Sequence, residues 1–167
     1  MDHEEHLLKD DGRIPNNPRL PLLLYRRALE DEAPRSEFMR RLAENRWGGV
    51  WVGGVFSYHH YHSTAHETLC VVGGEARLEL GGEDGITVEV AAGDAIVLPA
   101  GVGHRDAGSD RGFAVIGAYP EGQSWDLLTG RPEERPQALK NIESVPLPAA
   151  DPVFGEEGPL VERWGLR

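Results

Sequence analysis

Short apolar segments separated by glycine-rich turns dominate the middle of the chain. Two of them, at 76–80 and 87–90, alternate apolar and polar residues as half-buried strands do. The segment at 95–99 is apolar throughout, so we expect it to be buried on both faces. Short strands at this spacing, with no helix between them, are typical of an antiparallel sandwich or barrel. The pattern therefore predicts an all-β fold.

The N-terminal part of the chain follows other patterns. Residues 20–29 form a short apolar run preceded by prolines, which favours an edge strand over a helix. Further along, Ser36 is a suitable N-cap, and Phe38 and Leu42 share one helical face. We therefore expect one helix in this region, closed by the glycine pair at 48–49.

The length of 167 residues favours one domain. We expect a barrel core at 47–120, an N-terminal extension of strand and helix at 1–46, and a C-terminal extension at 121–167. Apolar side chains remain among the prolines of 151–166, so we expect this tail to pack on the barrel or on a partner subunit. Apolar extensions of this kind predict a homodimer, and the alternative is that they fold back on their own barrel.

Composition limits the partners and the cellular compartment. The net charge of −11 argues against binding to nucleic acid or to an anionic membrane, because both need a basic surface. Cys70 is the only cysteine, so no intrachain disulfide is expected, and we expect a buried structural thiol there. The acidic, polar N-terminus is unlike a signal peptide, and no apolar run reaches membrane-spanning length. These features predict a soluble, cytoplasmic protein.

Histidines and one glutamate gather in the middle of the chain. In a strand, residues two apart project from the same face, so His60 and His62 can approach one metal ion together. Residues 63–65 resemble a turn, after which a returning strand can bring the Glu67 carboxylate to the same point. A second turn, after the apolar segment at 95–99, delivers His104.

The spacing of these residues matches two motifs of the cupin superfamily. The positions that fit the first motif are Gly54, His60, His62, Glu67 and Gly74. The positions that fit the second motif are Gly93, Pro99, Gly101 and His104, with Gly108 in place of the usual final Asn. The chain thus resembles cupins, and more loosely the small bacterial cupins of the YjlB type. The resemblance implies a cupin double-stranded β-helix, a jelly-roll barrel, with a short N-terminal helix and an irregular C-terminal tail.

The four residues His60, His62, Glu67 and His104 offer three nitrogens and one oxygen. Such a set suits one divalent transition metal ion, namely iron, manganese, zinc, nickel, cobalt or copper, and leaves positions open for a ligand. The alternative is that these side chains are polar core residues or hydrogen-bond partners in a pocket. Because all four cupin ligand positions are filled, we expect a mononuclear metal site.

Strand parity also predicts the walls of the cavity. The side chains expected to line it are Phe56, Tyr58, Leu69 and Val71. Arg77 is a further candidate that could anchor an anionic substrate, although such a residue is more often part of a solvated pair. His66 should face away from the metal because it precedes Glu67 on the strand. The alternatives are that it sits at the turn and replaces one of the metal ligands, or that it supports a ligand as an acid or base. His66 and Tyr58 are the candidates for a catalytic acid or base.

Two classes of function fit these observations. In the first, the protein is a metal-dependent enzyme that acts on a small molecule inside the barrel, with oxygenase, isomerase or lyase chemistry. In the second, it is a non-catalytic module that binds a metal or a ligand for sensing or sequestration. A second acid or base beside the metal ligands would favour the enzyme.

Overall fold

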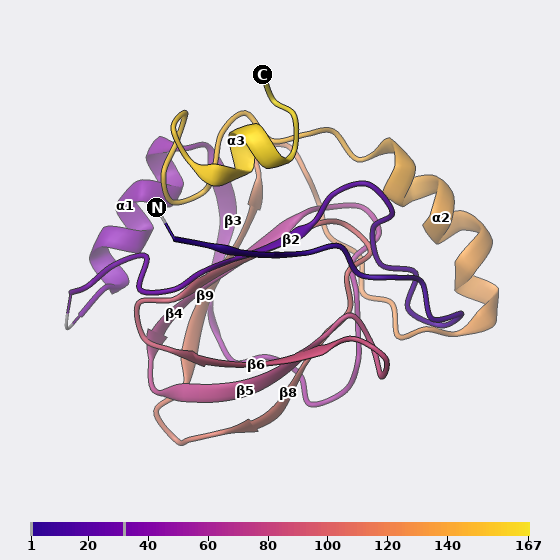
Figure 1. Ribbon diagram of the computed structural model, residues 1–167, viewed down its shortest axis with the longest axis horizontal. Helices are drawn as coiled ribbons and strands as arrows, with labels where there is room; N and C mark the ends of the chain where they lie inside the picture. Colours follow the sequence, from indigo (N-terminus) through magenta and orange to yellow (C-terminus); the bar gives the residue numbers. More distant parts are fainter. Residues whose placement is uncertain (1, 32) are drawn as a thin grey trace.

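Two antiparallel sheets make up most of the structure. The computed structural model describes residues 2–31 and 33–167 (Figure 1). The larger sheet has the strand order β1-β2-β7-β4-β9-β3, and the smaller sheet has the order β6-β5-β8. The strands are β1 (Glu4–His6), β2 (Leu22–Tyr25), β3 (Trp47–Gly53), β4 (Glu67–Gly73), β5 (Glu75–Leu80), β6 (Ile86–Ala91), β7 (Ala95–Leu98), β8 (His104–Ser109) and β9 (Ala114–Pro120). The helices are α1 (Arg35–Glu44), the 3-10 helix η1 (Pro132–Glu134), α2 (Arg135–Ser144) and α3 (Pro159–Arg163).

A first apolar core fills the space between the two sheets. Along β4, Leu69 and Val71 point into this core, while Thr68 and Cys70 point to the opposite face of the larger sheet. The expected alternation of β5 and β6 and the complete burial of β7 are confirmed. Two facing antiparallel sheets with few helices confirm the all-β jelly-roll fold.

A second core covers the outer face of the larger sheet. Figure 1 shows α1 and α3 on the side of this sheet that lies away from β5, β6 and β8. Phe38 of α1 and Leu160 and Trp164 of the C-terminal segment are buried there. The thiol of Cys70 is buried in the same core, and burial raises its pKa to about 12.

The C-terminal segment is anchored by one buried carboxylate. Asp151 accepts hydrogen bonds from the backbone N–H groups of Val153 and Leu160, and the Tyr25 hydroxyl donates another. Residues 151–166 therefore pack on their own barrel. The homodimer stays a prediction, but the apolar side chains that suggested it have partners within the chain.

Two expectations for the N-terminal part are wrong. Residues 22–25 do not form an edge strand, because β2 lies between β1 and β7. The polar residues at 4–6 form the edge strand instead, and their pattern of charges gave no strand signal. The helix begins at Arg35 rather than after Ser36, since the N–H of Phe38 already donates to the Pro34 carbonyl.

The end of the first helix also differs from the expectation. The helix stops at Glu44, and Arg46 takes a left-handed conformation with φ of 61°. The glycines at 48–49 lie inside β3, where the register with β9 shifts. Among the described residues, no helix is long and apolar enough to cross a membrane.

Candidate metal centre

The segment between β3 and β4 carries the first two histidines. Residues 54–62 were expected to continue a strand and residues 63–65 to form a turn, but the backbone of 54–66 is mostly irregular. It is held by an isolated bridge, in which the N–H of His60 donates to the His104 carbonyl and the N–H of His104 donates to the His60 carbonyl. This bridge places His60 directly opposite His104 at the start of β8. The single residue between His60 and His62 still lets both side chains face the same side.

The expected metal ligands lie together. His60, His62 and His104 each contribute one ring nitrogen to a cluster. These three nitrogens all lie within 4.8 Å of one another. The Oε1 atom of Glu67, at the start of β4, lies 3.4 Å from Nε2 of His62 and 3.2 Å from Nε2 of His104. All four side chains are buried.

The second ring nitrogen of each histidine is held by a backbone carbonyl. Nδ1 of His60 donates to the Tyr58 carbonyl at 2.9 Å, and Nδ1 of His104 donates to the Val102 carbonyl at 3.1 Å. Nδ1 of His62 donates to the carbonyl of Asp126 at 2.5 Å. A carbonyl can only accept, so each contact keeps the proton on Nδ1 and leaves the Nε2 lone pair free. Outer partners of this kind orient histidines that bind metals.

Burial and neighbouring charges shift the pKa values of the proposed ligands in different directions. Burial, together with the nearby His104, lowers the pKa of His60 to about 3. Burial opposes protonation of His62 as well, but the Glu67 carboxylate outweighs it and raises the pKa of His62. Burial opposes ionisation of Glu67, but the neighbouring imidazoles of His104 and His62 outweigh it and lower the pKa of Glu67. Glu67 is therefore a carboxylate, and His60 is neutral at neutral pH.

The donor set fits a divalent transition metal ion. The Oε1 atom of Glu67 is buried without a hydrogen-bond partner, which is costly for a carboxylate oxygen. A bound cation would satisfy this oxygen. Three imidazole nitrogens and one carboxylate oxygen are donors that iron, manganese, cobalt, nickel, copper and zinc accept.

A cavity of about 190 Å³ opens over these four residues. Phe56 and Leu69 line it, as parity suggested. Tyr58, Val71 and Arg77 were also expected to line the cavity, but they do not. Tyr58 lines a separate hollow beside His59, because the chain is irregular at this point. Val71 lies deeper, within the core between the sheets, and the Arg77 side chain is exposed, donating to the Ala107 carbonyl.

The two candidate acid–base residues lie outside the cavity. His66 is buried on the other face of β4, where its ring lies 4.8 Å from the Trp164 ring. Its Nδ1 accepts a hydrogen bond from the N–H of Ala100, and burial lowers its pKa to about 4. The His66 side chain therefore faces away from the proposed metal ligands, as strand parity predicts. Neither His66 nor Tyr58 points at the cavity, so their catalytic role stays a hypothesis without support from the geometry.

Sequence reasoning missed several residues of the cavity wall, among them Trp51 and Tyr119. Trp51 lies across Gly117, and a Cβ atom at that glycine would fall 2.1 Å from the indole ring. The indole Nε1 donates to the Tyr119 hydroxyl at 2.8 Å. Burial raises the pKa of Tyr119, and the negative charge of Glu67 raises it further. The strand parity of β9 could have placed Tyr119 inward, but the fit between Trp51 and Gly117 depends on the pairing of β3 with β9.

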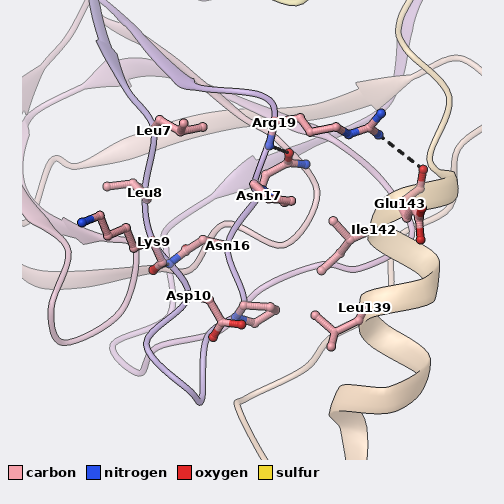
Figure 2. Close-up of a pocket in the computed structure, with 12 residues that line it drawn as sticks. Leu7, Leu8, Lys9, Asp10, Asn16, Asn17, Arg19, Leu139, Ile142 and Glu143 are labelled. Carbon is pink, nitrogen blue, oxygen red and sulfur yellow. Dashed lines mark hydrogen bonds between the residues drawn. The ribbon is translucent and has the colours of Figure 1, made fainter.

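A larger hollow lies elsewhere, between residues 7–19 and α2. Figure 2 shows Leu7, Leu8, Leu139 and Ile142 around it. The buried Asn16 and Asn17 beside it are already bonded: their amide groups donate to backbone carbonyls, and their oxygens accept backbone N–H groups. No metal-ligand cluster lies there among the described residues. The cavity over Glu67 differs because it contains a buried polar atom without a partner.

Comparison with known proteins identifies the family of this chain. The protein-family model of the cupin domain matches residues 48–107 of this chain. The uncharacterized protein YjlB of Bacillus subtilis (strain 168) is 45% identical over 161 residues, which cover 96% of each chain. Acireductone dioxygenase from Bacillus anthracis, solved with a cadmium ion in its active centre, is 21% identical with a TM-score of 0.43, over 57% of this chain and 64% of its own. A DUF861 family protein from Thermotoga maritima is 23% identical with a TM-score of 0.36, over 52% of this chain and 92% of its own. The chain belongs to the cupin superfamily and, within it, to the family of YjlB.

Proposed function

We propose that this cupin binds one divalent transition metal ion and a small molecule in the cavity above it. His60, His62, His104 and Glu67 would hold the ion. A bound ion would supply Lewis-acid or redox chemistry to an oxygen atom of the small molecule. On this proposal the protein is a metal-dependent enzyme whose reaction is of oxygenase, isomerase or lyase type.

One observation carries the metal assignment. All three histidines donate Nδ1–H to a backbone carbonyl, and two of the three Nε2 atoms lie within 3.4 Å of the same unpaired oxygen of Glu67. Core histidines that serve only packing have no reason to share this arrangement. The orientation of each ring by a backbone group supports preorganised metal ligands rather than a chance polar cluster.

The other residues of the cavity would prepare the site for a ligand. Trp51 and Phe56 give it apolar walls, which exclude water and strengthen electrostatic interactions inside. The Tyr119 hydroxyl accepts a hydrogen bond from Trp51, and its raised pKa keeps its own proton in place. The negative charge of Glu67 contributes to this raised pKa, so the protonated Tyr119 would help to hold the Glu67 carboxylate in place.

The non-catalytic alternative is favoured by one feature of the cavity. The acid–base candidates His66 and Tyr58 lie outside it. Of the described residues that line it, the titratable ones are the four proposed ligands and Tyr119, whose hydroxyl already accepts a bond. Chemistry that needs a free general base is therefore disfavoured. A module that binds a metal and a ligand without turnover remains the second candidate.

Metal analysis of protein purified without chelator tests the proposal. We expect close to one divalent transition metal ion per chain in the natural protein and most of it lost in His60→Ala and in His104→Ala. His59→Ala is the matched control, because His59 neighbours His60 but pairs with Glu79 outside the cavity. Metal content that is unchanged in both ligand variants, or lost equally in His59→Ala, would contradict the assignment.

A further inference from the structure

The cavity over the metal ligands has an unusually aromatic wall. Trp51 and Tyr119 form one side of it, next to Gly117. Phe56 and Trp125 lie at the opening, and each of these residues is 52% exposed. Large exposed aromatic groups gathered at the mouth of a cavity are a common sign of a ligand site, because a ligand can cover them.

The two exposed rings are held in place from different sides. The Phe56 ring stacks on Tyr58, with centroids 5.0 Å apart, and its edge faces the His60 ring at 5.2 Å. The Trp125 ring lies 5.7 Å from the His62 ring and is nearly parallel to the ring of Tyr119. Each exposed ring thus rests on a different proposed metal ligand. A flat molecule that enters between them would contact both before it reaches the metal.

The polar groups of the cavity do not suit an anion. None of the described residues that line it is a lysine or an arginine. The nearest arginine of β8, Arg105, is already paired with Glu79 outside the cavity. The chain as a whole carries a charge of −11, which repels anions. Among the described residues that line the cavity, none supplies a positive side chain beside a bound metal ion. An uncharged ligand can bind this ion through an oxygen atom alone.

The size of the cavity limits the ligand to about one ring. Its volume is about 190 Å³, whereas an engineered cavity of about 150 Å³ in another protein is known to bind benzene. A six-membered ring with one short substituent therefore fills the space. Sites for drug-sized ligands are larger, at about 300–1,000 Å³.

We propose that the ligand of this cavity is an uncharged, single-ring aromatic molecule with an oxygen atom directed at the metal. The inference rests on the proposed metal function and gives its substrate class. The ring would lie against Trp125 and Phe56. Its oxygen would point toward the three Nε2 atoms and Glu67, where Tyr119 adds a further polar group.

Binding of a matched pair of probes tests this inference. Benzyl alcohol and benzoate share a ring and differ in charge, and butyrate is an anion without a ring. NMR titrations with Zn²⁺-loaded and with metal-free protein would give the dissociation constant of each probe. We expect benzyl alcohol to bind, with a dissociation constant that rises roughly 3- to 10-fold in Trp125→Ala and in Phe56→Ala, since aromatic contacts are lost.

Two controls keep the result interpretable. Leu139→Ala removes an exposed apolar side chain on α2, away from this cavity, and should leave the affinity unchanged. Trp125→Leu keeps an apolar group at the opening and serves as a second variant if Trp125→Ala does not fold. Tighter binding of benzoate or butyrate than of benzyl alcohol, or no effect of either aromatic variant, would overturn the inference.

The same titrations separate this inference from the proposed function. If Zn²⁺ binds but benzyl alcohol does not, the metal site stands and the substrate class is wrong. If Zn²⁺ does not bind, binding of benzyl alcohol to the metal-free protein, weakened in Trp125→Ala, still supports the aromatic ligand while the metal proposal fails.

Discussion

Asp126 links the proposed metal centre to the aromatic opening. Its backbone carbonyl accepts the Nδ1–H of His62, and its carboxylate accepts the N–H of Ser63 at 2.6 Å and the hydroxyl of Ser63 at 2.5 Å. Trp125 is the preceding residue. Replacement of Asp126 by alanine removes the carboxylate but leaves every proposed metal ligand and the carbonyl in the chain. The variant therefore tests whether the support behind His62 matters.

The expected magnitude follows from the two lost contacts. Hydrogen bonds to a charged group contribute about 1.5–3 kcal/mol each, and the low end applies because Asp126 is only partly buried. Part of this loss appears in the free energy of unfolding. The rest of the loss appears in metal binding, because His62 and its loop are held less firmly. Loss of a hydrogen-bond partner behind a metal ligand typically lowers metal affinity about 10- to 100-fold. We expect Asp126→Ala to weaken metal binding by about tenfold, or about 1.4 kcal/mol.

Competition with a chromophoric chelator for Zn²⁺ would measure this effect. Asp106→Ala is the matched control, because the Asp106 carboxylate also accepts one backbone N–H, from Gly108, and one serine hydroxyl, from Ser109. Those bonds lie on the exposed end of β8, away from the cavity. A Zn²⁺ affinity of Asp126→Ala within twofold of the natural protein, or an equal loss in Asp106→Ala, would refute the reasoning.

Two further predictions concern stability. Burial lowers the pKa of His66 from 6.5 to about 4, so the unfolded chain binds more protons between these values, and stability should fall as the pH drops through that window. Urea unfolding should show a loss of roughly 1.5 kcal/mol between about pH 6.5 and pH 5, and a clearly smaller loss in His66→Gln. Equal pH dependence of the two proteins would show that the assignment is wrong. Gly117→Ala should lower the melting temperature and change the tryptophan fluorescence, because its Cβ would fall 2.1 Å from the Trp51 ring. Gly54→Ala is the control, since a Cβ there meets nothing within 4 Å, and equal effects of both changes would count against the Trp51 contact.

The sequence predicted the fold class and the proposed ligands because both leave a pattern along the chain. Alternation in β5 and β6 reports which face is buried, and the spacing of His60, His62, Glu67 and His104 matches the two cupin motifs. The strand parity used for His60 and His62 survived although residues 54–66 are irregular, since the bridge to His104 fixes their direction.

Features that depend on distant pairing could not be predicted in the same way. The edge strand β1 consists of two glutamates and a histidine, and it forms by antiparallel pairing with the backbone of β2. Ser36 has the chemistry of a cap, yet the helix starts earlier because the Pro34 carbonyl is available. Trp51 enters the cavity wall only where a glycine on β9 leaves room. Arg77 was assigned to the cavity wall from its position within one strand. That position does not show which face of the smaller sheet meets solvent.

Anomalous X-ray diffraction at the absorption edge of the bound metal would test the central claim most directly. Crystals of protein purified without chelator should show one anomalous peak per chain. It should lie about 2.0–2.2 Å from Nε2 of His60, His62 and His104 and from a carboxylate oxygen of Glu67, as expected for transition-metal bonds to nitrogen and oxygen. A metal peak at another position, or metal-containing crystals with no peak among these four residues, would contradict the account.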